Sequence, residues 1–475
     1  MPFNGFAFLL GFLPLALLGF ALAARFGSGW AKAWLIAVSL AFYAYGAPRF
    51  LPLLLASVGG NLLLLRVMAG SRHRGTLAAV GVALNLALLA WFKYAAPLLD
   101  LPVPLPLGIS FFTFVQIGCL LSQAASDQPP PRAADHALFV LFFPTLTSGP
   151  ILNPAETMPQ FSRALQWRLA SEDLAIGSGF FLIGLLKKGV LADPLGSLVA
   201  AGFAQPDGLA LIPAWQTATA WSLQLYFDFS GYTDMAIGLG WMLGFRLPDN
   251  FEQPYRARCI IDYWQRWHMS LTRFLMANVH APLTMAVLRH RRRHGQPIND
   301  AARRTPSGFL TMMAGPIVAT MLLIGIWHGP SWTYVLFGLV HAGFLLVNHA
   351  WRLWRGPVLP AGLAVAITYG AVLVGGVVFR ATTPSNAGAL LAGMAGLHGL
   401  GLAGDDPRIV LNALWIAALY GIVWLAPTTR QFMLRQTDGR LAWAPTGRWA
   451  VVMGCAATLG LLAAGGTGEF VYFRF

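Results

Sequence analysis

The stretch IVATMLLIGIWHG, residues 317–329, closes an apolar segment that begins near residue 308 and ends in a histidine, His328. A segment of this length can cross a bilayer as a helix. An ionisable group at membrane depth costs free energy and is usually functional. Imidazole titrates near pH ~6.5, so its ring can take up and release a proton at cellular pH. A second histidine, His268, lies in the polar and aromatic stretch DYWQRWHMSL at 262–271. The two histidines are therefore the first candidates for chemistry.

The composition predicts a polytopic integral membrane protein. The chain has 475 residues, 57% hydrophobic and 11% charged, with a mean hydropathy of +0.61. Soluble proteins usually carry about 25% charged residues. Several runs of about 18–25 residues have almost no charge, which is long enough to cross ~30 Å of hydrocarbon. We expect an all-α fold with one membrane-embedded domain over residues 1–475. The candidate membrane segments lie near 3–24, 31–47, 49–69, 76–98, 107–125, 136–152, 172–201, 213–245, 308–328, 331–353, 359–379, 409–426 and 448–466.

The first apolar run extends from Phe6 to Ala24, and no basic stretch precedes it. It is long enough to span the membrane. We expect a transmembrane helix here rather than a cleavable signal peptide.

The segment FFPTLTSGPIL at 142–152 carries two prolines, Pro144 and Pro150, that interrupt a simple helix. Irregular backbone at membrane depth is tolerated where it is buried in protein or lines a wet cavity. The segment is therefore either a cavity wall or an ordinary kinked helix.

The positive charge of the chain indicates membrane topology rather than nucleic-acid binding. The net charge is +14, from 32 Lys and Arg against 18 Asp and Glu. The basic residues gather in short loops between apolar runs, as the positive-inside bias predicts. The densest loop, RHRRRHGQPINDAARRTP at 289–306, is expected in the cytosol. The three cysteines (Cys119, Cys259 and Cys455) are far apart and odd in number, so we interpret them as packing residues.

Charged residues in a central block, 215–285, lie within or beside apolar sequence. Asp228 and Asp234 fall in LQLYFDFSGYTDMAIGLGWMLGF at 223–245. An Asp at the centre of a membrane helix costs about 2.5–3.5 kcal/mol on insertion scales. Such residues normally face a wet interior and have partners. A buried hydrogen-bonding role that shapes a cavity explains them as well as a catalytic one does. Lys187 and Lys188 are expected as anchors that extend to the membrane surface.

Seven strings, in order along the chain, resemble the membrane-bound O-acyltransferase family, in its bacterial polysaccharide-modifying branch. That branch acts in alginate O-acetylation, peptidoglycan O-acetylation and teichoic-acid D-alanyl transfer. The strings are PLGISFFTF (106–114), FPTLTSGPI (143–151), KKGVLADPL (187–195), YFDFSGYTDMAIGLGWMLGF (226–245), YWQRWHMSL (263–271), IWHGPSWTYVLFGLVHAG (326–343) and FVYFRF (470–475).

The resemblance implies a ring of helices around a thinned, funnel-shaped centre with re-entrant segments and the histidines at its neck. The near-invariant histidine of the family corresponds to His328, and its second, more variable histidine to His268. Asp193, Asp228 and Asp234 are carried over as supporting polar residues. The resemblance also implies a bacterial inner-membrane location, no bound cofactor, and a cytoplasmic acyl donor, acetyl-CoA or another acyl thioester. The implied acceptor is an extracytoplasmic polysaccharide or a periplasmic esterase-like partner.

The sequence also departs from the family pattern in three places, one of which is the usual Gly-Gly-Asn-Arg tail, replaced here by the Arg-rich segment 289–306. Where the family usually has a Tyr and an Asp-x-Tyr-Arg run after GISFFTF, this chain has Cys119, Ser122, Ala124 and Ala125. Where Arg-Asp-Tyr usually follows the WHxSL motif, this chain has Met276, Ala277 and Asn278, followed by His280 and Pro282. These changes keep the histidines and put the usual acceptor or partner contacts in doubt.

Acyl transfer to a hydroxyl needs a base, and a positioned histidine typically contributes about 10²–10⁴-fold. His328 suits the base, and His268 could orient it, hold the acceptor or donate to the oxyanion. The two histidines lie far apart in sequence and match no metal-ligand spacing, so no metal is expected. No Ser or Cys lies in an activating elbow. A transporter or flippase is the alternative class, against which the lack of a visible repeat argues. A non-catalytic scaffold of exopolysaccharide assembly is a third.

Overall fold

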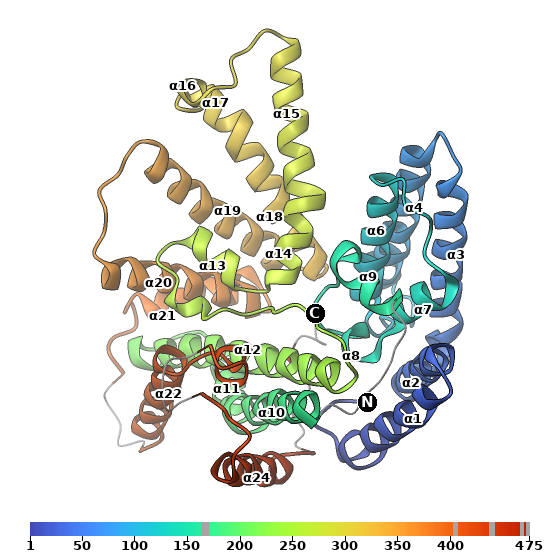
Figure 1. Ribbon diagram of the computed structural model, residues 1–475. Coiled ribbons are helices and arrows are strands. Elements are labelled where there is room, and N and C mark those ends of the chain that lie inside the picture. The colour runs from blue at the N-terminus through green and yellow to red at the C-terminus, as the bar shows by residue number, and fades with distance from the viewer. Residues whose placement is uncertain (163–170, 402–406, 437–441, 466–469, 472–475) are drawn as a thin grey trace. The chain divides into compact units, whose positions relative to one another are not determined.

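Helices make up all the regular structure that can be described. The computed structural model describes residues 1–162, 171–401, 407–436, 442–465 and 470–471. Within these ranges no strand is found, and one isolated bridge pairs Phe251 with Trp267. The prediction of an all-α fold is confirmed (Figure 1).

The chain divides into two compact units, each built from separate stretches of sequence. The first comprises Met1–Val190, Asp228–Asp249 and Pro427–Arg474, and the second comprises Leu191–Phe227, Asn250–Ala426 and Phe475. Two helical elements contribute to both units: η4 (Lys187–Ala192) and the long helix α12 (Leu211–Met242). The single membrane-embedded domain expected from the sequence stays a prediction.

Elements labelled η are 3-10 or π helices, and elements labelled α are α-helices. The first unit contains the N-terminal helices and two helices near the C-terminus. They are η1 (Ala7–Phe12), α1 (Leu13–Arg25), α2 (Ser28–Gly46), η2 (Pro48–Phe50), α3 (Leu51–Ala69), α4 (Arg74–Ala90), η3 (Trp91–Ala95), α5 (Ala96–Leu98), α6 (Ile109–Ala124), α7 (Ala133–Leu141), α8 (Phe143–Leu146), α9 (Pro154–Ser162), α10 (Ser171–Leu186), α23 (Thr429–Met433) and α24 (Gly447–Leu462).

The second unit contains both candidate histidines. Its helices are η5 (Asp193–Leu195), α11 (Gly196–Ala204), η6 (Pro254–Arg256), α13 (Ile260–Arg266), α14 (Met269–Leu275), η7 (Met276–His280), α15 (Ala281–Arg293), α16 (Asp300–Arg303), α17 (Pro306–Phe309), η8 (Leu310–Ala314), α18 (Gly315–His328), α19 (Trp332–Leu353), α20 (Ala361–Arg380), α21 (Pro384–Met394) and α22 (Pro407–Leu425).

The chain is a polytopic membrane protein, as the composition predicts. Among the described residues, eight helical stretches are long and apolar enough to span a bilayer. They are Ala7–Arg25, Pro48–Ala69, Arg74–Leu98, Ser171–Ala204, Pro306–His328, Trp332–Leu353, Ala361–Arg380 and Arg408–Leu425. The segments expected near 107–125 and 448–466 form the shorter apolar helices α6 and α24.

The proline-bearing segment at 142–152 is broken rather than smoothly kinked. Helix α7 ends at Leu141, and Phe142 leaves the helical conformation with ψ of 107°. The single turn of α8 then follows, with Pro144 near its start. All the residues from Phe142 to Leu152 are buried, so the irregular backbone is enclosed in protein. Its role as a cavity wall stays a prediction.

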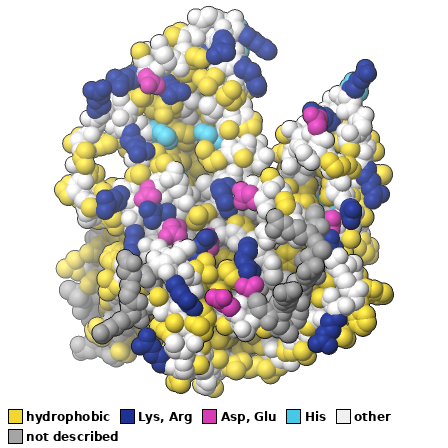
Figure 2. Space-filling model, in the orientation of Figure 1, with side chains coloured by type: hydrophobic (Ala, Val, Ile, Leu, Met, Phe, Trp, Pro, Cys, Tyr) yellow, Lys and Arg dark blue, Asp and Glu magenta, His cyan; other side chains and the backbone are white. Residues whose placement is uncertain are grey.

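The basic segment 289–306 differs from the expected loop. Arg289 to Arg293 form the last turns of helix α15, and Asp300–Arg303 form the short helix α16. Arg291 is buried, and its guanidinium has hydrogen-bond partners there. Its Nη2 donates to the carbonyl oxygen of Pro297 at 3.1 Å, and its Nη1 donates to Oγ1 of Thr311 at 3.0 Å. Figure 2 shows Lys and Arg side chains gathered where Figure 1 places α15, α16 and α17. The segment is therefore a structured basic tip.

Helices α18 and α19 form a close antiparallel hairpin, side by side in Figure 1. A Cβ added to Gly325 would lie 2.2 Å from the Tyr334 carbonyl oxygen. One added to Gly338 would lie 2.5 Å from the carbonyl oxygen of Met321. Small residues at such crossings let two membrane helices approach backbone to backbone. This close contact fixes the end of α18, where His328 lies.

Candidate active site

His328 is the last residue of helix α18. The helix stops there because Gly329 and Pro330 follow, and α19 begins after Ser331, whose side chain accepts from the N–H of Thr333. The predicted helix end at His328 is confirmed. The imidazole is 7% exposed, so it lies inside the second unit.

Aromatic rings surround His328. Its imidazole meets Phe379 edge-on, with ring centroids 4.8 Å apart, and lies 5.9 Å from the ring of Tyr334 and 6.1 Å from that of Phe337. These residues come from the end of α20 and the first turns of α19. Because two helices other than its own contribute these rings, the orientation of the His328 ring is set by tertiary packing.

His268 lies between helices α13 and α14 in an uncommon backbone conformation. Its φ of 44° and ψ of 51° place it in the left-handed region, which few residues other than glycine adopt. The side chain is 2% exposed, and its Nδ1 is 3.4 Å from Oδ1 of Asn250. Burial lowers the pKa of His268 to about 3, because the charged imidazolium loses its hydration. His268 is therefore neutral at cellular pH.

The structure brings the two predicted histidines together at one indole ring. The ring of Trp327 is 4.7 Å from that of His328 and 6.5 Å from that of His268, centroid to centroid. Residues separated widely in the sequence thus share one aromatic neighbour. Two buried imidazoles in this arrangement can carry proton-transfer chemistry in a dry environment.

His341 lies deeper along α19 in the same aromatic layer. Its ring is 4.6 Å from Phe337 and 5.3 Å from Trp264, and a Cβ on Gly375 would lie 2.2 Å from its Nε2. Its Nδ1 has no hydrogen-bond partner among the described residues. These contacts give His341 a packing role in the aromatic layer.

Asp228 and Asp234 lie in the first unit, where they pair with consecutive lysines. Lys188 Nζ is 2.8 Å from the carboxylate of Asp228, and Lys187 Nζ is 2.7 Å from that of Asp234. The two aspartates are six residues apart on α12, and the lysines follow directly after α10. The aspartates therefore have the partners that buried carboxylates require.

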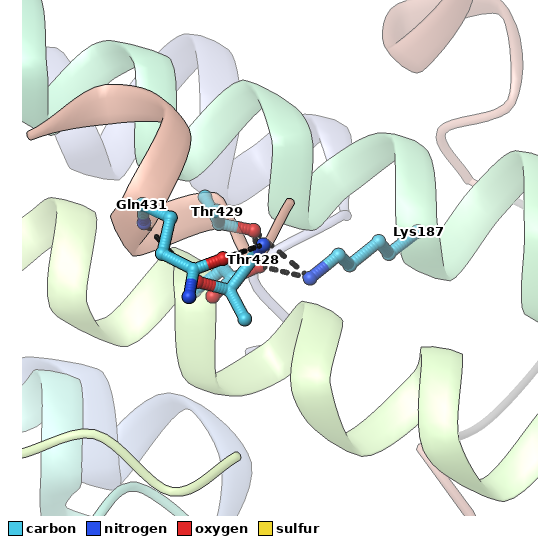
Figure 3. A network of polar contacts seen from close by, with 5 residues as sticks. Lys187, Thr428, Thr429 and Gln431 are labelled. Atoms are coloured by element: carbon cyan, nitrogen blue, oxygen red, sulfur yellow. Dashed lines mark hydrogen bonds and ion pairs between the residues drawn. The ribbon is translucent and has the colours of Figure 1, made fainter. Parts of the chain in front are cut away.

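Each pair is extended by a contact from the C-terminal region. Thr429 Oγ1 donates to Asp234 at 2.6 Å and accepts from Lys187 at 2.9 Å (Figure 3). The backbone N–H of Val471 donates to Asp228 at 2.8 Å. The side chain of Lys188 is 4% exposed, so the interpretation of this lysine as an anchor that extends to the membrane surface is wrong. An aspartate on the neighbouring helix holds it inside the unit.

Asp193 opens the short helix η5, at the break before α11, and is half-buried in the same unit as the histidines. The divergent positions Met276, Ala277 and Asn278 begin the π-helical turn η7, where Met276 is 47% exposed. The side-chain amide of Asn278 donates to the carbonyl oxygen of Phe274, in the preceding helix α14, at 2.9 Å.

Sequence reasoning missed three residues of this site: Asn250, Trp327 and Phe379. Asn250 contacts His268, while Trp327 and Phe379 contact His328. Trp327 stands beside His328 in the sequence, so the IWHG string itself could have suggested it. Within the described ranges, no three His, Cys, Asp or Glu side chains gather closely enough to hold a metal ion.

Comparisons with known proteins identify the family. The family model of the membrane-bound O-acyltransferases, MBOAT, matches residues 79–295. The chain is 34% identical to the peptidoglycan O-acetyltransferase of Helicobacter pylori, over 84% of this chain and 81% of that protein. The chain belongs to the membrane-bound O-acyltransferase family. It is also 32% identical to the probable alginate O-acetylase AlgI of Azotobacter vinelandii, over 100% of both chains.

A more distant likeness joins this membrane-bound O-acyltransferase to the teichoic acid D-alanyltransferase of Streptococcus thermophilus. The identity is 28%, over 52% of this chain and 57% of that protein. The acyltransferase family predicted from the seven strings is thus confirmed. His268 lies within the matched range of the family model and His328 lies beyond it, so their roles rest on the geometry and on the sequence motifs.

Proposed function

We propose that this O-acyltransferase moves an acyl group, acetyl by default, from a cytoplasmic thioester to a hydroxyl outside the bacterial inner membrane. The acceptor is a polysaccharide or a periplasmic partner that passes the group on, and the donor is acetyl-CoA or another acyl thioester. One observation carries the proposal: two buried histidines share the indole of Trp327 in an enzyme whose relatives are named for O-acetylation of peptidoglycan and of alginate.

The chemistry assigned to His328 is general-base catalysis. The hydroxyl oxygen of the acceptor bonds to the thioester carbonyl carbon while its proton passes to the imidazole of His328, and the carbonyl oxygen takes the negative charge. When the carbon–sulfur bond breaks, the carbonyl reforms and the leaving thiolate takes the proton from the imidazolium. The products are an ester and a free thiol, and His328 is neutral again.

The helix directions support a site near the extracytoplasmic side. His328 ends α18, Tyr334 lies in the first turn of α19 and Phe379 lies at the end of α20. Arg303 and Arg304 precede α17, and Arg352 and Arg355 lie at the end of α19, so basic residues mark the opposite end of the hairpin. The positive-inside bias assigns that basic end to the cytoplasm. An acceptor hydroxyl would then approach His328 from outside.

The test is a two-sided transfer assay. Purified protein in sealed vesicles receives acetyl-CoA labelled in its acetyl group on the side of the basic tip, and an acetyl-free polysaccharide with its periplasmic partner on the other. We expect one thiol released for each ester formed. Passage of the labelled donor across the membrane without thiol release would instead identify a flippase. The absence of both thiol release and passage would identify a scaffold.

A further inference from the structure

Asn250 holds the unusual conformation of His268 through three contacts with the segment that carries it. The carbonyl oxygen of Asn250 accepts from the N–H of Met269 at 3.0 Å, and its Oδ1 accepts from the N–H of Ser270 at 3.1 Å. The third contact joins the same Oδ1 to Nδ1 of His268. Asn250 is 0% exposed, so water does not compete for these groups.

A short antiparallel pairing of the two segments supports the contacts. Phe251 bridges to Trp267, and the N–H of Glu252 donates to the carbonyl oxygen of Arg266 at 3.0 Å. Trp267 also packs its ring 5.0 Å from that of Phe251. The position of Asn250 relative to His268 is therefore fixed by the backbone on both sides of the contact.

The hydrogen-bond pattern determines which ring nitrogen of His268 carries the proton. The N–H of Ser270 can only donate, so the amide atom facing it is the oxygen of Asn250 and not its nitrogen. The oxygen of an amide can only accept. Nδ1 of His268, facing that same oxygen, must therefore be the donor. A neutral imidazole has one N–H, so Nε2 carries the lone pair.

We infer that Asn250 is a positioning residue that fixes this tautomer, so that His268 accepts a hydrogen bond at Nε2 from the acceptor molecule. The inference rests on the proposed function and chooses among the three roles that the sequence left open for His268. A neutral His268 with its proton on Nδ1 cannot donate to the oxyanion from Nε2, and direct donation is therefore excluded. The proton of the attacking hydroxyl still goes to His328.

Among the described residues, the titratable side chains on the segments around His268 include two tyrosines, Tyr255 and Tyr263, whose rings stack on that of Trp267. Glu252 follows Asn250, Asp262 and Arg266 form an ion pair at 2.6 Å on α13, Arg273 lies on α14, and His328 contacts the same indole. Burial keeps the pKa of His268 low, so the neutral tautomer is the state present in the working range of pH.

The direct test measures the tautomer and does not depend on activity. Protein labelled with ¹⁵N in its histidine rings is compared with a His268→Gln variant to assign the signals of His268. We expect Nε2 of the wild-type ring to show the chemical shift of an unprotonated nitrogen, and Asn250→Ala to show a mixture of both tautomers. A proton on Nε2 in the wild type would overturn the inference.

The variant Asn250→Asp separates a positioning role from a merely structural one. It keeps an acceptor for both Ser270 and His268, and Nδ2 of Asn250 has no hydrogen-bond partner among the described residues, so no such contact is lost. A carboxylate beside His268 raises its pKa, by about 1–3 units for a close opposite charge. Protonated His268 cannot accept at Nε2, so the lower pH limit of transfer should move upward by a similar amount. An unchanged pH profile would leave Asn250 with only a structural role.

Kinetic measurements on single and double variants of Asn250 and His268 complete the test. Asn250→Ala should raise KM for the polysaccharide more than it lowers kcat, and it should add no further loss in a His268→Ala background. Full additivity of the two losses would contradict the inference. If wild-type protein transfers no acyl group yet shows the expected tautomer, the proposed function is wrong, while the effect of Asn250 on the tautomer stands. If wild-type protein transfers the acyl group but carries the proton of His268 on Nε2, the proposed function stands and the inferred role of Asn250 is wrong.

Discussion

The ring of Phe379 stands edge-on to the imidazole of His328, with centroids 4.8 Å apart and the ring planes at 89°. Phe379 also packs against Tyr334 and Phe337, at centroid distances of 5.2 Å and 5.1 Å. It therefore joins α20 to the helix hairpin at the point where the candidate base lies. Edge-to-face pairs of this kind contribute about 0.5–1.5 kcal/mol beyond the burial of their area.

Replacing Phe379 by Leu should loosen the imidazole of His328 without removing it. We expect kcat to fall by about 10–100-fold, because small misplacements of a catalytic group cost up to about 10² in rate. The measurement is thiol release from acetyl-CoA under saturating acceptor. Phe309→Leu is the matched control, since Phe309 packs against Trp354 at the other end of the hairpin. Equal losses in both variants would contradict a specific role for Phe379.

Removing the imidazole of His328 should abolish transfer. His328→Ala loses the proposed base, so the rate should fall by about 10²–10⁴-fold while expression and membrane insertion stay near wild type. His398→Ala, at an exposed position, serves as the control. Retention of most of the rate by purified His328→Ala protein would show that the base lies elsewhere.

Asp228→Asn should destabilise the first unit strongly. It leaves the ammonium of Lys188 buried without its counter-charge, and breaking a buried pair in this way costs about 3–5 kcal/mol. Thermal unfolding in detergent should show a clear loss of stability. The control is Asp300→Asn, which removes the carboxylate of an exposed pair with Arg303 and should cost about 0–1 kcal/mol. Similar losses in the two variants would mean that the buried pair contributes no more than the exposed one.

The basic tip should lie in the cytoplasm. With Cys119, Cys259 and Cys455 replaced, a cysteine at Gln296 should resist membrane-impermeant thiol reagents in intact cells, because short basic segments resist translocation. A cysteine at Thr382, exposed just beyond the end of α20, should react readily from outside. Rapid external labelling at Gln296 would reverse the orientation.

The divergent turn η7 should alter partner choice. Met276, Ala277 and Asn278 replace charged and aromatic residues usual in the family, and with them a potential ion pair and bidentate contact. We expect intact thioester use but poor glycan acetylation when the chain is co-expressed with the periplasmic partner of a standard alginate-acetylating relative. Full acetylation with that foreign partner would show that this segment does not set partner choice.

The membrane fold could be predicted because its signals are local. Apolar runs identify spans, and Pro144 identifies the break after α7 without knowledge of any neighbour. The end of α18 at His328 and the start of α19 after Ser331 likewise follow from Gly329 and Pro330.

The contacts within the site could not be predicted, because they join distant parts of the chain. No periodicity indicates that Asn250 would reach His268 through a single bridge, nor that Phe379 would pack on His328. The lysines illustrate the same point. Lys188 was expected at a membrane surface because its sequence neighbours are apolar, but its partner Asp228 lies on another helix.

The glycine contacts between α18 and α19 have a consequence for how substrates enter. Gly325 and Gly338 place backbone against backbone at two points, so at these points no side chain lies between the two helices that could yield. It should move as one rigid body. Room for a longer acyl chain must then come from the α20 edge, where Phe379 is the bulky side chain beside the imidazole. Selection for larger acyl donors should therefore yield substitutions at Phe379 and its neighbours on α20 and leave both glycines unchanged.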